Sequence, residues 1–73
     1  MWFDDQSKLE EAIEFLQMEL LGGYGVDVEH IHWNARIDRI SPRTLRRAKH
    51  VLGIVSEKRG WHGGWTWRLP TQE

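Results

Sequence analysis

The chain has 73 residues, which is near the lower limit for a domain stabilised by a single hydrophobic core. It contains no cysteine, which excludes disulfide bonds and thiolate metal sites, and its net charge of −1 and pI of 6.4 argue against a uniformly basic protein. No apolar run approaches the roughly 20 residues of a membrane span, and the acidic segment 1–11 predicts no signal peptide, so we expect a cytoplasmic domain without a membrane partner.

The first predicted helix spans residues 7–21. Ser7 and Glu10 have the spacing of a capping box, which predicts that the helix begins there. Gly22 and Gly23 predict its end, because glycine is the residue that most often follows a helix. Apolar residues recur every three or four positions between these signals, which predicts one buried stripe formed by Leu9, Ala12, Ile13, Leu16 and Leu20.

The second predicted helix spans residues 28–38, with Asp27 as its N-cap. A short strand near residues 25–26 is considered just before it. The core-facing positions of this helix are expected to be Val28, Ile31 and Ala35.

The third predicted helix spans residues 42–52. Ser41 followed by Pro42 is a strong N-cap and first-turn pair, and Gly53 marks the end. Only two or three residues separate the second and third helices, so we expect them to cross at a steep angle.

The segment 54–69 predicts a two-stranded hairpin. Residues 54–59 are expected to form its first strand, and the sequence Gly-Trp-His-Gly-Gly supplies a glycine-rich turn. On the return strand Trp65, Trp67 and Leu69 alternate with polar residues, which favours a core position for both tryptophans over base stacking. Trp61 next to the turn is compatible either with stacking on a base or sugar or with packing back on the domain. The expected fold class is α+β, a small winged helix-turn-helix with three helices followed by a two-stranded β-hairpin wing.

Charge is distributed unevenly along the chain. Residues 1–29 carry eight acidic side chains and one basic one, whereas residues 30–73 carry nine basic and three acidic ones. A polyanion would therefore meet the second half of the chain. Helical spacing places Leu45, Ala48 and Leu52 on one side of the third helix, and it groups the basic side chains Arg43, Arg46, Arg47 and His50 on the other.

A stripe of like charges destabilises a helix, whereas a phosphate backbone or a guanine edge would bind it. We therefore interpret the third helix as the recognition helix of a double-stranded DNA-binding module. The basic side chains of this stripe are expected in or beside the major groove, with Ser41 and Thr44 at the N-terminal end of the helix. The remaining predicted contacts, mostly to phosphate, are Arg39, Lys49, Lys58, Arg59, His62 and Arg68.

Other interpretations were weighed against DNA binding. The basic stripe is also compatible with a solvated surface, and the acidic first helix with a protein-interaction or dimerisation domain that docks a basic surface. His30 and His32 lie two residues apart on a helix and have no cysteine to complete a metal site, which favours a structural or surface role for both. The sequence contains no catalytic residue set and no phosphate-binding loop, so we expect neither an enzyme nor a bound cofactor.

The segment 40–70, ISPRTLRRAKHVLGIVSEKRGWHGGWTWRLP, resembles the C-terminal winged-helix segment of RepA-like replication ATPases and related primase–helicases of phages and plasmids. The TLRRAK sequence followed by a wing is more specific for that family than a helix-turn-helix alone. The resemblance covers about the last half of the chain. The matching positions are Ala35, Ile40, Ser41, Thr44, Leu45, Arg46, Arg47, Ala48, Lys49, Leu52, Gly53, Gly60, Gly63, Gly64, Trp65, Trp67, Leu69 and Pro70.

The resemblance implies a DNA-binding or positioning module in the replication of a mobile element, alone or beside a replication ATPase domain in the same or another chain. Two departures qualify it. Arg39 stands where the family prefers a turn glycine, which leaves open a longer or differently shaped turn, because a positive φ is unfavourable for arginine. The chain also contains no ATPase motif, so only the role of the tail can apply to it.

Overall fold

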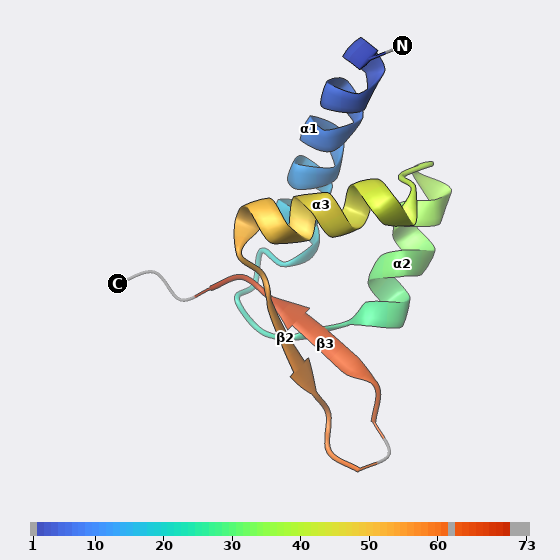
Figure 1. Cartoon of the computed structure of the whole chain (residues 1–73). Coiled ribbons are helices and arrows are strands. Elements are labelled where there is room, and N and C mark those ends of the chain that lie inside the picture. Colours follow the sequence, from blue (N-terminus) through green and yellow to red (C-terminus); the bar gives the residue numbers. More distant parts are fainter. Residues whose placement is uncertain (1, 62, 71–73) are drawn as a thin grey trace.

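The computed structural model describes the backbone of residues 2–61 and 63–70, and the side chains from Ser7 onward within those ranges. The chain folds into three helices and a three-stranded antiparallel sheet, in the order helix, strand, helix, helix, strand, strand (Figure 1). This arrangement confirms the predicted α+β fold class and is compatible with a winged helix. The elements are α1 (Trp2–Glu19), β1 (Val26–Asp27), α2 (Val28–Ile37), α3 (Pro42–Leu52), β2 (Val55–Lys58) and β3 (Trp65–Arg68).

Helix α1 begins earlier than its sequence predicts. The helix starts at Trp2, so Ser7 lies inside it, and the predicted capping box at Ser7 is wrong. A capping box is a local pattern, and it does not mark a helix start where the preceding residues are themselves helical. The helix ends at Glu19, and a turn follows in which Gly23 has a φ of +82°. The predicted stripe is confirmed, because Ala12, Leu16 and Leu20 are fully buried and Leu9 and Ile13 pack against the core.

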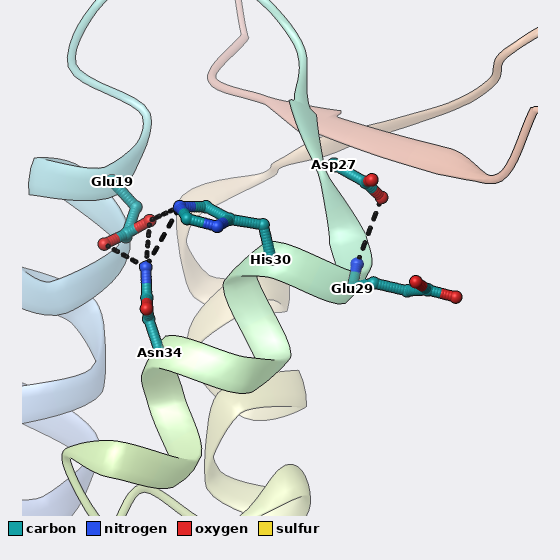
Figure 2. Close-up of polar contacts among 5 residues, drawn as sticks. All are labelled: Glu19, Asp27, Glu29, His30 and Asn34. Atoms are coloured by element: carbon teal, nitrogen blue, oxygen red, sulfur yellow. Dashed lines mark hydrogen bonds and ion pairs between the residues drawn. The ribbon is translucent and has the colours of Figure 1, made fainter.

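Helix α2 is capped as predicted and is joined to the end of α1. The Asp27 carboxylate accepts a hydrogen bond of 3.2 Å from the backbone N–H of Glu29 (Figure 2). The Asn34 amide donates to the two carboxylate oxygens of Glu19 at 3.4 and 3.3 Å, and its nitrogen lies 3.1 Å from Nε2 of His30. These contacts hold α2 against α1 at the edge of the core.

The turn between α2 and α3 keeps a glycine-like conformation even though it contains Arg39. Arg39 has a φ of +62°, and no other non-glycine residue in the described part of the chain has a positive φ. Its N–H donates to the carbonyl of Arg36 at 3.0 Å, and the N–H of Ile40 donates to the carbonyl of Ala35 at 2.8 Å. This pair of bonds is the Schellman pattern that glycine usually completes. Arg39 thus adopts the left-handed conformation that this pattern requires.

Helix α3 has the predicted bounds and both predicted signals. The Ser41 hydroxyl accepts a hydrogen bond of 3.2 Å from the N–H of Thr44, and Gly53 adopts the left-handed conformation after the last turn. Leu45 and Ala48 are buried in the core that α1 and α2 also line. Figure 1 shows α3 lying across α1, with the hairpin starting directly from its C-terminal end.

The sheet has the strand order β1–β3–β2, so the return strand of the hairpin is its centre. The short strand that the sequence analysis places near residues 25–26 is present as β1, and its Val26 pairs with Trp67. Trp67 is 7 % exposed and belongs to the core, as predicted. Trp65 is 50 % exposed, so its predicted core position is wrong. It shares the face of Trp67 but lies closer to the hairpin tip, and Figure 1 shows that end of the hairpin projecting beyond the helices.

Among the described helices, none combines the length and the apolar character that crossing a lipid bilayer requires.

Candidate nucleic-acid interface

Helix α3 presents a basic face to solvent. Arg43, Arg46, Arg47 and His50 are all exposed, whereas Leu45 and Ala48 on the opposite side are buried. With 3.6 residues per turn, these four basic positions centre on the direction opposite to the buried pair. We call Arg43, Arg46, Arg47 and His50 the arginine ridge.

Among the side chains that the structure describes, no carboxylate forms an ion pair with the arginine ridge. Over residues 7–61 and 63–70, the ion pairs join Arg68 to Glu57 and His30 to Glu19, and neither involves the ridge. Leu9 of α1 lines a groove together with Arg46, Arg47 and His50, so α1 borders the ridge on one side, while all four ridge residues remain exposed. The ridge therefore presents its charges to solvent, where a polyanion could reach them.

The N-terminal end of α3 uses its polar side chains for its own structure. The Ser41 hydroxyl accepts from the Thr44 N–H and also donates to the Thr44 Oγ1 at 2.9 Å. Arg39 is exposed in the preceding turn, on the same groove of about 370 Å³ that Arg36 and His32 line. Arg36 was not among the predicted contacts, although its spacing of three from Arg39 at the end of a helix would have indicated a shared surface.

The predicted phosphate contacts outside the ridge differ in their surroundings. The Lys49 ammonium lies 5.2 Å from the centroid of the Trp67 ring, and Lys49 is half-buried. Lys58 lies 5.7 Å from the centroid of the Trp65 ring on the facing strand, and both Lys58 and Arg59 are exposed. His62 lies outside the described residues. The wing thus contributes two exposed basic residues, Lys58 and Arg59.

Arg68 is engaged elsewhere. Its Nε and Nη2 donate to the two carboxylate oxygens of Glu57 at 3.3 Å each, across the β2–β3 pair. A guanidinium already bound in this bidentate way has fewer donors left for a phosphate. We therefore leave Arg68 out of the candidate interface.

The two histidines of α2 occupy separate surroundings. His30 contacts Asn34 and Glu19, whereas the ring of His32 lies 5.6 Å from that of Trp67. In the part of the chain that the structure describes, no three side chains of the metal-binding types gather in one place.

A further groove lies away from the arginine ridge, between α1 and α2. It has a volume of about 630 Å³, and its lining combines apolar and acidic side chains. Met18 is 69 % exposed and Ile37 is 64 % exposed there. The complete lining is Glu11, Glu14, Phe15, Met18, Glu19, Asn34, Ile37, Asp38 and Ile40.

Comparison with known proteins adds no relative, because no protein-family model, curated protein or solved structure gave a significant match to this chain.

Proposed function

We propose that this domain binds double-stranded DNA with the arginine ridge in or beside the major groove and with the wing on the adjacent backbone. The observation that carries the proposal is the ridge itself, a set of exposed cationic side chains without a described carboxylate partner, on a helix whose two ends are both capped. The replication or mobile-element context, and a cytoplasmic location, are part of the same proposal and rest on the sequence pattern of residues 40–70.

The fold supports this use of α3 in a physical way. Arginine is always charged, and its planar fork matches both a phosphate and the O6 and N7 atoms of guanine. Helix α3 is about 16 Å long at 1.5 Å per residue, so its exposed face can follow the major groove for about five base pairs. The exposed cations Arg39, Lys58 and Arg59 flank the ridge at the turn and on the wing.

The test is a mobility shift of random duplex DNA at two salt concentrations. If five cations contact phosphates, the logarithm of the binding constant should fall by about 4.5 per tenfold rise in salt. The double variant Arg46→Ala plus Arg47→Ala should weaken binding at least tenfold and leave the melting temperature unchanged or raised, because it relieves like-charge repulsion.

The matched control is Lys8→Ala plus Arg68→Ala, which also removes two positive charges but at positions outside the ridge. It should weaken binding much less than the ridge variant does. Equal losses in the two variants would mean that net charge, and not the ridge, determines binding. Unchanged affinity in the ridge variant would remove α3 from the interface.

A second candidate function is docking of a basic protein segment in the groove between α1 and α2. The groove favours this function because its apolar floor includes Phe15 and Ile40, while Glu11, Glu14 and Asp38 supply negative charge. An amphipathic helix with lysine or arginine beside its apolar anchors would complement it, as part of a replication ATPase domain or another protein. Absence of duplex binding at low salt, with loss of partner binding in Met18→Glu plus Ile37→Glu, would favour this candidate. A concentration-dependent homodimer would assign the groove to a second copy of the chain.

A further inference from the structure

Two tryptophans near the tip of the wing are exposed to different extents. Trp61 is 92 % exposed, and Trp65 is 50 % exposed. Indole is the largest apolar side chain, and small domains usually bury it because their cores are short of apolar surface. Of the two interpretations of Trp61 left open by the sequence, packing back on the domain is excluded by its exposure.

The loop that carries Trp61 is closed by a backbone hydrogen bond and contains two glycines that the fold requires. The N–H of Arg59 donates to the carbonyl of Gly64 at 2.9 Å, which closes the loop at its base. Gly60 has a φ of +62°, a conformation that favours glycine, and a Cβ placed on Gly63 would overlap the carbonyl oxygen of Arg59. These requirements define the backbone of the loop at residues 59–60 and 63–64, and the Trp61 indole beside them is exposed.

The charges around the two indoles are positive. Lys58 and Arg59 are exposed beside them, and Glu57, the acidic residue of the hairpin, is bound to Arg68. Segment 56–66 contains no aliphatic side chain, so the large apolar groups of this segment are its two indoles. Aromatic rings interleaved with cations are the combination that binds single-stranded nucleic acid, because bases stack on the rings while the cations contact the phosphates.

We propose that the wing tip binds unpaired bases at the end of a duplex, with Trp61 as the stacking residue and Trp65, Lys58 and Arg59 beside it. This inference rests on the proposed duplex binding by α3. The ligand of the domain is then a junction between double-stranded and single-stranded DNA. Trp61 lies eight positions after Gly53, so the tip reaches at most about 26 Å from the end of α3 at about 3.3 Å per residue. That reach corresponds to about eight base steps along a strand.

The experiment compares three DNA molecules in a fluorescence anisotropy titration: a blunt duplex, a shorter duplex with a single-stranded extension and the same number of phosphates, and a single strand. The wild-type domain should bind the extended duplex about tenfold more tightly than the blunt one. Trp61→Ala should remove this preference and leave affinity for the blunt duplex unchanged, and Trp61→Phe should keep most of it. Trp33→Ala is the matched control, because Trp33 is also exposed (61 %) but lies on α2.

The outcomes separate this inference from duplex binding. Tight binding of both duplexes without a preference, or a preference that survives Trp61→Ala, would overturn the stacking site and leave the role of α3 standing. A loss of preference in Trp33→Ala equal to that in Trp61→Ala would also overturn it. Binding of the extended duplex and the single strand but not of the blunt duplex would support the stacking site and contradict the proposed duplex interface.

Discussion

The Lys49 ammonium lies 5.2 Å from the centroid of the Trp67 ring, so a basic residue of the recognition helix candidate packs on the indole that anchors the wing. The ring of His32 lies 5.6 Å from the same indole and is tilted by 59° against it. Trp67 on β3 therefore contacts α2 and α3 together. This contact fixes the direction in which the hairpin leaves the helices, and with it the position of the wing relative to the arginine ridge.

The first prediction concerns this anchor. Trp67→Ala should lower the free energy of unfolding by about 3–5 kcal/mol, because it removes a buried aromatic side chain and leaves a cavity. Trp65→Ala should cost less than about 1.5 kcal/mol, since half of that side chain is already in water. Urea unfolding measures both, and Trp67→Phe provides a milder variant in case Trp67→Ala does not fold. Equal losses at the two positions would contradict the assignment of Trp67 as the anchor.

The contrast between these tryptophans shows what sequence alone can predict. Alternation along the strand correctly places Trp65 and Trp67 on one face, because the side-chain period of a strand is two. It carries no information about how far the helices extend over that face. Trp67 lies under α2 and α3, whereas Trp65 lies beyond them, and only the three-dimensional arrangement distinguishes the two.

The ends of the helices also include some that the sequence predicts and one that it does not. Asp27, Ser41 and Gly53 mark helix ends correctly, because each end is formed by a bond or a backbone conformation within a few residues of the signal. Ser7 is the exception, since its pattern fits a helix start while the chain before it is already helical. The sequence also does not predict the ion pair of Arg68. Its partner Glu57 is eleven residues away, and only the register of β2 and β3 brings the two side chains together.

The second prediction concerns the strained turn. Arg39→Gly should raise the free energy of unfolding by about 0.5–1 kcal/mol, because the relief of a left-handed arginine outweighs the greater freedom of glycine in the unfolded chain. Thermal unfolding should show a melting temperature that is a few degrees higher. Duplex affinity should fall at the same time if Arg39 contacts phosphate. Arg39→Ala is the control, since it loses the charge but keeps the backbone strain, and it should lower affinity without the gain in stability.

The third prediction separates capping from DNA binding at Ser41. Ser41→Ala should destabilise the domain by about 1 kcal/mol, because the Thr44 N–H loses its side-chain acceptor. Ser41→Asp keeps an acceptor and should retain most of the stability. Its carboxylate would face the phosphates expected at this end of α3, so duplex affinity should fall severalfold below that of wild type. If Ser41→Asp binds duplex DNA as well as wild type does, the N-terminal end of α3 lies away from the backbone.

The fourth prediction concerns the ion pair across the hairpin. The pair joins side chains that are 30 % and 53 % exposed, and such pairs contribute at most about 1 kcal/mol to stability because solvent screens them. Arg68→Ala should therefore lower the melting temperature only slightly. Duplex affinity should change by less than about threefold, whereas Arg59→Ala on the same wing should reduce it more, since the Arg59 guanidinium is exposed and has no carboxylate partner among the described residues. A larger loss of affinity from Arg68→Ala would mean that Arg68 exchanges Glu57 for phosphate when DNA binds. The variant Glu57→Gln would then increase affinity, because it releases the guanidinium in advance.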